Sequence, residues 1–194
     1  MAEKRHGEYV PPESEGYFSI IVVEPQAAHG LHEHTVAVQR GYRDEEALIK
    51  DLKSYDPQLP ELLECLLEGL GMEDKDAQFF AQGFAMTYTA LAYQSEIMGG
   101  RLPDLDVRVI RGYCAGLDDL EDEVNAYVKD IIDELEEHNQ YLVDCWDDYL
   151  LSRHDGPTGS QIMALRIGGA LMHDCIAQQF NMHQLLASYS DNVN

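Results

Sequence analysis

Apolar side chains recur at helical spacing along residues 117–151. Successive members of this stripe lie three or four residues apart, which matches the period of about 3.6 residues of an α-helix and not the period of two of a strand. The opposite face is almost uniformly acidic. The pattern therefore predicts one long amphipathic helix. Its stripe consists of Leu117, Leu120, Val124, Tyr127, Ile131, Leu135, His138, Leu142, Cys145 and Tyr149.

Two other segments, 74–98 and 160–188, are neutral around most of their circumference, which is typical of buried helices. The first carries only Glu96 as a charge beyond its opening turn, and the second carries only Arg166 and Asp174. We predict that these two helices form the core pair, because small residues in the second allow close approach. Shorter helical patterns occupy 44–55, 60–70 and 104–115.

The N-terminal region has a different pattern. Short β-branched runs at 17–23 and 35–39 predict two strands of a hairpin. Residues 1–16 are polar and predict a flexible arm. The predicted fold class is mainly α: a helical bundle of about six helices with a small N-terminal β-hairpin. The expected organisation is a single mostly helical domain over 17–194, with the β-hairpin at 17–42 and the helical bundle at 44–190.

Net charge narrows the class of partners more than any motif does. The chain has 36 acidic and 13 basic residues, a net charge of −23. Such a chain repels nucleic acids and anionic membranes, and it has no basic patch with interleaved aromatic residues. We therefore expect a protein partner, with neither direct nucleic-acid binding nor membrane binding. A homodimer through the hairpin or the helix faces is also consistent with the pattern.

The acidic side of residues 117–151 admits three interpretations. Thirteen acids and one base, Lys129, lie between positions 118 and 148. They could form a solvated surface, a docking surface for a basic partner, including mimicry of nucleic acid, or a weak multi-site cation binder. The acids expected on this surface include Asp119, Asp122, Glu123, Asp130, Asp133, Glu134 and Glu137.

Four cysteines stand at wide spacings without a CxxC or CxxH pair, which predicts reduced, buried thiols. The first sixteen residues lack the apolar run of a signal peptide, and no stretch of about 20 residues is apolar enough to span a membrane. These features favour a cytoplasmic protein. The cysteines are Cys65, Cys114, Cys145 and Cys175.

A histidine-rich stretch offers the first candidate for chemistry. Imidazole nitrogens are ligands for zinc and other transition metals, and a neighbouring carboxylate can add an oxygen. The candidate ligands are His29, His32, His34 and Glu33. The DDxxD sequence at 118–122 has the form that holds magnesium in isoprenoid synthases, although acids at the start of a helix explain it more simply. No cofactor is expected unless zinc or magnesium binds at these places.

Polar residues inside the two neutral helices are the second candidate. Glu96, Arg166, His173 and Asp174 could form a buried polar cluster, or Arg166 could pair with an acid on a neighbouring helix. No catalytic residue is assigned, because the sequence has no nucleophile elbow, phosphate loop, dinucleotide fingerprint or HExxH. The sequence therefore favours a non-catalytic protein–protein interaction module. The alternative is a metal-binding protein or metal-dependent enzyme.

Overall fold

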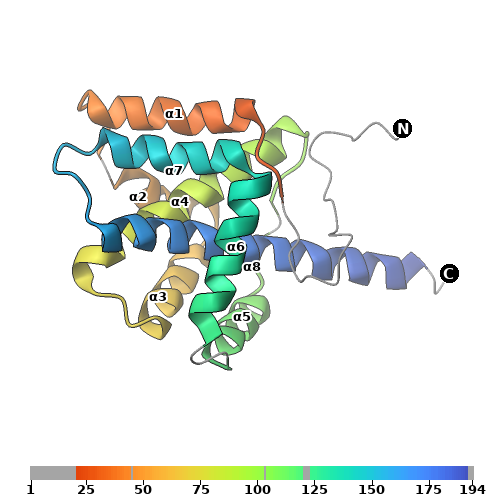
Figure 1. The fold of residues 1–194 in the computed structure, drawn as a ribbon. Helices are drawn as coiled ribbons and strands as arrows, with labels where there is room; N and C mark the ends of the chain where they lie inside the picture. Colours follow the sequence, from red (N-terminus) through yellow and green to blue (C-terminus); the bar gives the residue numbers. More distant parts are fainter. Residues whose placement is uncertain (1–20, 45, 103, 120–122, 192–194) are drawn as a thin grey trace.

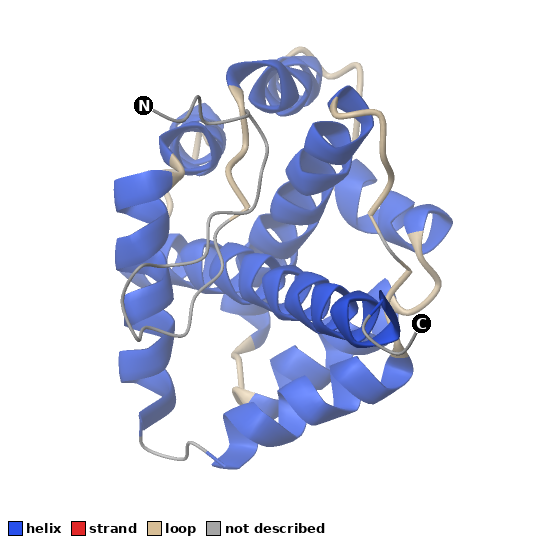
Figure 2. Ribbon diagram, turned by 90° about the vertical axis from the view of Figure 1, so that its right-hand side faces the viewer, coloured by secondary structure: helices blue, strands red, loops and turns tan. Residues whose placement is uncertain are grey.

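The computed structural model describes residues 21–44, 46–102, 104–119 and 123–191, and within these ranges the chain forms eight helices and no strand (Figures 1 and 2). The predicted arm at 1–16 lies outside the described residues. None of the described helices has both the length and the apolar character needed to cross a membrane. The helices are α1 (Pro25–Gln39), α2 (Ala47–Tyr55), α3 (Leu59–Gly69), α4 (Asp74–Ile97), α5 (Val107–Asp119), α6 (Val124–His138), α7 (Gln140–Ser152) and α8 (Gly159–Asp191).

Helices α4 and α8 cross at the centre of the molecule, as the neutral character of both predicted. Their backbones touch where glycine leaves room. A Cβ atom built on Gly83 would lie 1.9 Å from the carbonyl oxygen of Leu165, and one built on Gly168 would lie 2.1 Å from that of Phe80. Only residues without a side chain allow so close an approach. The predicted core pair is confirmed, and two glycines set its separation.

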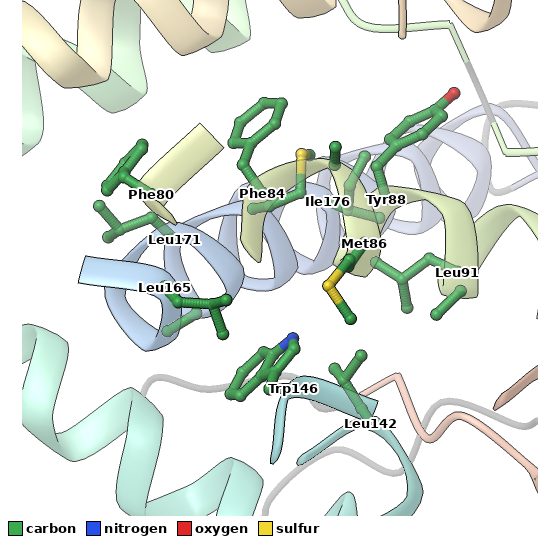
Figure 3. Close-up of a cluster of buried hydrophobic side chains, with 14 of the residues drawn as sticks. Phe80, Phe84, Met86, Tyr88, Leu91, Leu142, Trp146, Leu165, Leu171 and Ile176 are labelled. Carbon is green, nitrogen blue, oxygen red and sulfur yellow. The ribbon is translucent and has the colours of Figure 1, made fainter. Parts of the chain in front are cut away.

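Trp146 of α7 fills the space beside this crossing (Figure 3). The side chain is fully buried, and its indole ring lies against Gly169, where an added Cβ would be 2.3 Å from the ring. Its Nε1 donates a hydrogen bond to Oγ1 of buried Thr87 at 3.2 Å. The one polar atom of the ring is therefore satisfied inside an otherwise apolar cluster.

The predicted hairpin is wrong for the described residues, because the segment assigned to its second strand belongs to α1. This helix begins at Pro25, where proline is tolerated, and buries Ala27, Leu31 and Thr35. These residues are spaced four apart, so they lie on one face of the helix, which packs against α4 and α7 (Figure 1). Tertiary packing outweighs the strand preference of the β-branched residues near its end.

The predicted long acidic helix is divided among α5, α6 and α7, and this division together with the additional helix α1 makes the count of about six helices too low. One helix, α5, ends at Asp119, and Asn139 separates α6 from α7 with φ −133° and ψ 48°. The predicted stripe is nevertheless buried on both sides of Asn139, at Ile131, Leu135 and Leu142 among others. Its member nearest the break, His138, is exposed. The period was read correctly, but the break depends on a distant contact.

That contact is made to residues 21–24, a segment without regular secondary structure that directly precedes α1. The side-chain amide of Asn139 accepts a hydrogen bond from Val23 N at 3.0 Å and donates one to Ile21 O at 2.8 Å. Gln94 Oε1 accepts from Glu24 N at 2.8 Å, and Nε2 of His173 lies 3.2 Å from Ile21 N. The three side chains that hold this segment are almost completely buried, at 1 to 2% exposure. They satisfy backbone groups that have no helical partner.

The expectation of four reduced thiols is wrong for two of the cysteines. Cys65 of α3 and Cys114 of α5 form a disulfide, with Cα atoms 6.8 Å apart. Cys145 and Cys175 are buried free thiols, and burial raises the pKa of both. The pairing could not be read from the sequence, because 49 residues separate two cysteines that only the packing of α3 on α5 brings together.

Candidate functional site

The acidic residues of α6 and α7 form an exposed surface that we call the acidic face. Within residues 123–152 there are nine carboxylates and one lysine. Of the acids predicted for this surface, Glu123, Asp130, Asp133 and Glu137 are exposed, and Glu134 is partly exposed. Asp122 lies outside the described residues, and Asp119 is the last residue of α5. The acidic face comprises Glu123, Asp130, Asp133, Glu134, Glu136, Glu137, Asp144, Asp147 and Asp148.

Two cations neutralise only part of this face. Lys129 pairs with Asp133, and Arg166 of α8 reaches both Glu136 of α6 and Asp147 of α7, the latter at 2.9 Å. Arg166 therefore joins three helices. Among the described residues, six further carboxylates form no ion pair with a lysine or arginine: Glu123, Asp130, Glu134, Glu137, Asp144 and Asp148. Of these, Asp148 lies near His32, and Glu134 and Glu137 lie near His138.

The predicted histidine ligands are divided between two sides of α1. His29 and His32 are exposed, with His29 3.4 Å from Glu33 and His32 3.2 Å from Asp148 of α7. His34 is buried, and its Nδ1 accepts a hydrogen bond from Arg43 at 3.0 Å. Burial and the nearby guanidinium lower the pKa of His34, so its imidazole is neutral. In the described part of the chain, no group of three or more His, Cys, Asp or Glu side chains could hold a metal ion.

The four polar residues predicted as a possible buried cluster lie in separate environments. Glu96 is exposed near the end of α4, and Arg166 binds acids on neighbouring helices, as the alternative interpretation had it. His173 bonds to the backbone of residue 21, while Asp174 faces α5 and α6. Consecutive residues of a helix point about 100° apart, which explains why neighbouring His173 and Asp174 have different partners.

Asp174 is the centre of a polar cluster that draws on three helices. Its Oδ2 accepts hydrogen bonds from Tyr127 of α6 at 2.5 Å, from Tyr113 of α5 at 2.8 Å and from Gln178 of α8 at 3.0 Å. Only 3% of Asp174 is exposed. Burial raises the pKa of this carboxyl, although the three hydrogen bonds oppose the rise. Burial beside the carboxylate also raises the pKa of both tyrosines.

A pocket of about 220 Å³ opens beside this cluster, and we call it the tyrosine pocket. Tyr113 and Tyr127 contribute aromatic walls, and Gln178 contributes an amide. The remaining wall comes from the helix α5, where Cβ atoms built on Gly112 and Gly116 would meet nothing within 4 Å. The lining residues are Gly112, Tyr113, Gly116, Leu117, Tyr127 and Gln178.

The sequence indicated Asp174 as a candidate but not the tyrosines that surround it. Gln178 could have been inferred as a partner from the sequence, because it follows Asp174 by four residues and therefore shares its face of the helix. Tyr113 and Tyr127 lie in two other helices, and nothing in their spacing points to α8. Their role depends on how α5 and α6 pack against that helix.

Three larger pockets are less selective in character. One of about 310 Å³ is lined by Arg153 and Asp155, so both signs of charge face it. A second, of about 450 Å³ beside His34, is lined by Arg43 as well as by Glu33 and Glu96, so both signs of charge face it too. Another, of about 400 Å³, lies beside the Cys65–Cys114 disulfide and is lined mainly by apolar side chains, with Glu68 as its one acid. None of the three arranges several hydrogen-bond donors around one buried carboxylate as the cluster beside the tyrosine pocket does.

In comparisons with known proteins, no family model, curated protein or solved structure matches this chain.

Proposed function

We propose that the protein is a non-catalytic interaction module that docks a basic protein through its acidic face. The observation that supports this proposal most is the set of six exposed or partly exposed carboxylates without a lysine or arginine partner in the described residues. Clustered charges of one sign attract an oppositely charged partner and accelerate its association. A partner that normally binds nucleic acid through a basic groove is one special case of this chemistry.

The charge of the face is not explained by stability. Like charges four residues apart on a helix are destabilising by about 0.2–0.5 kcal/mol per pair. Asp130 and Glu134 form one such pair, and Asp133 and Glu137 form another. The apolar sides of α6 and α7 are buried against the core, so the carboxylates are not needed for packing.

A metal-dependent function has less support from the geometry. Its candidate ligands His29 and His32 are on the opposite side of α1 from His34, and each already has a carboxylate neighbour. A solvated surface with no partner is the other interpretation, and the experiment below distinguishes it from a docking surface.

The test compares two triple variants with the same net charge. In the first, Asp130→Asn, Glu137→Gln and Asp144→Asn remove three acids from the acidic face. In the control, Glu61, Glu64 and Glu68, all exposed on α3, are changed to Gln. Each variant makes the net charge less negative, from −23 to −20, so the total charge of the two variants is matched.

Binding of a short lysine-rich peptide is then measured by fluorescence anisotropy at about 0.15 M salt. An exposed ion pair contributes about 0.2–1 kcal/mol, so losing three predicts weaker binding by about 3- to 150-fold for the first variant. The control is expected to bind like the wild type. Equal weakening in both variants would show that only the net charge matters, and the proposed docking face would be rejected.

A further inference from the structure

We propose that the tyrosine pocket binds an alkylammonium group, either of a free small amine or of a lysine side chain. This site differs from the acidic face in position and in construction. It lies between α5, α6 and α8, and the acid next to it is Asp174, a buried carboxylate hydrogen-bonded to three of the lining side chains, and not an exposed one.

Asp174 is a buried carboxylate held by hydrogen-bond donors, and this environment supports the binding of a cation beside it. Two hydroxyls and one amide group point toward the same oxygen, Oδ2, and all three are able to donate. These hydrogen bonds favour the ionised carboxylate and oppose the rise in pKa that burial causes. The interactions of Asp174 in the described residues include no cation. Buried carboxylates are usually paired with a cation, so the negative potential at this point is available to a positively charged ligand.

Aromatic side chains line the pocket, and they also support the binding of an ammonium group. The rings of Tyr113 and Tyr127 line the pocket, while their hydroxyls are held by the carboxylate behind them. Aromatic faces attract ammonium groups, and cages of aromatic rings with an acid nearby recognise alkylated amines. The ring positions are fixed by hydrogen bonds, so little order has to be created on binding.

The volume of the pocket also fits a small alkylammonium group. A volume of about 220 Å³ corresponds to roughly seven water molecules in the liquid, which suits an alkylammonium group and excludes a nucleotide. Glycine at positions 112 and 116 keeps one wall bare, because any side chain there would enter the open space. The pocket beside His34 is lined by an arginine as well as acids, so it favours a cation less.

The experiment titrates the full chain with propylammonium and with propanol, its neutral counterpart of similar size, at about 0.15 M salt. Backbone amide shifts at Gly112 and Gly116 are followed by NMR. We expect saturable shifts with propylammonium and at least about tenfold weaker binding of propanol. Equal binding of the two compounds would reject the proposal.

Variants locate the site without relying on a change in the core. Gly116→Leu fills the pocket from an exposed helix position, so the chain should fold and lose propylammonium binding by about tenfold or more. Gly159→Leu is the matched control, since an added Cβ there also meets nothing and this residue is not part of the pocket. Wild-type affinity in Gly116→Leu, followed by shifts elsewhere in the chain, would overturn the assignment. Asp174→Asn should weaken propylammonium and leave propanol unchanged.

A final comparison separates the two sources of the ammonium group. Lysine blocked at its amino and carboxyl ends is titrated alone and in competition with propylammonium. Competition at the same amides assigns the pocket to lysine side chains as well as to free amines. Binding of propylammonium without binding of blocked lysine restricts it to free amines, and binding of neither contradicts the proposal. These outcomes are independent of the lysine-rich peptide test, whose variants leave the pocket intact.

Discussion

Replacing Gly168 with alanine tests the contact that sets the separation of α4 and α8. The added Cβ would lie 2.1 Å from the carbonyl oxygen of Phe80, and that oxygen belongs to the backbone of a buried helix. A normal contact requires a separation larger by about 1 Å, which neither atom can reach by rotating a side chain. One helix must therefore shift against the other along the centre of the core.

The magnitude follows from two opposing effects. Overpacking a dense core destabilises by about 1–3 kcal/mol, and the backbone nature of this contact places it near the upper end. Alanine is a better helix former than glycine by about 0.5–1 kcal/mol, which offsets part of the loss. The expected net decrease in the free energy of unfolding is about 2 kcal/mol, equivalent to a Tm lower by about 4–8 °C for a chain of this size.

The matched control is Gly112→Ala on α5, where an added Cβ meets nothing within 4 Å. This variant has the same gain in helix propensity without the clash, so its free energy of unfolding should rise by about 0.5–1 kcal/mol. Urea denaturation followed by far-ultraviolet circular dichroism measures both variants. If Gly168→Ala proved as stable as Gly112→Ala, the close backbone contact between α4 and α8 would be refuted.

Three further predictions concern buried polar groups and the disulfide. The pKa of His173 is lowered from 6.5 to about 4 by burial, so the unfolded chain takes up a proton between these values and the folded chain does not. This group should lower the free energy of unfolding by about 3 kcal/mol as the pH decreases through this range, and the slope of the urea midpoint with pH should be smaller in His173→Gln, where His34, whose pKa is also lowered, still contributes. Asn139→Ala removes two hydrogen bonds to residues 21–24 and should lower the free energy of unfolding by about 1–3 kcal/mol. The control is Asn125→Ala at an exposed position, which should change this free energy by less than about 0.5 kcal/mol. Similar urea midpoints for the two variants would argue against the contact. Reducing the Cys65–Cys114 disulfide, which spans 49 residues, should lower the free energy of unfolding by about 2–4 kcal/mol, and an unchanged midpoint with reductant would contradict the pairing.

The parts of the fold that the sequence predicted are those set by local periodicity. The neutral character of 74–98 and 160–188 identified α4 and α8, because a helix that is apolar or small on all sides has to be buried. The apolar stripe of 117–151 likewise gave the buried sides of α6 and α7. In each case the information lies within one helix and does not depend on its partner.

The errors arose where a distant contact decides the local structure. The stripe runs through residue 139 without a change of period, and the break there accompanies hydrogen bonds to residues 21–24, more than a hundred positions away. The strand assigned at 35–39 rested on β-branched residues, whereas burial of Ala27 and Leu31 against α4 and α7 makes this region helical. Strand preference is a weak indicator when packing is available.

The candidate site shows the same limit. A carboxylate in a neutral helix was recognisable as costly to bury and therefore notable. Its tyrosine partners come from two helices that share no sequence pattern with α8, so only the packing of the three helices reveals the cluster. The exposed acids, in contrast, were largely located from the sequence, because their positions opposite the stripe place them on the surface.

The way in which residues 21–24 are held predicts an uneven tolerance to substitution. The groups that Asn139, Gln94 and His173 bind are backbone amides and a carbonyl, and these are common to nearly all amino acids. The hydrogen bonds themselves therefore tolerate any residue except proline, which lacks the amide hydrogen, whereas buried Val23 and partly buried Ile21 also pack against the core. The side chains that bind these peptide groups have no such freedom. In these hydrogen bonds, the chemical specificity belongs to the side chains of Asn139, Gln94 and His173, and the segment that they hold contributes its peptide groups.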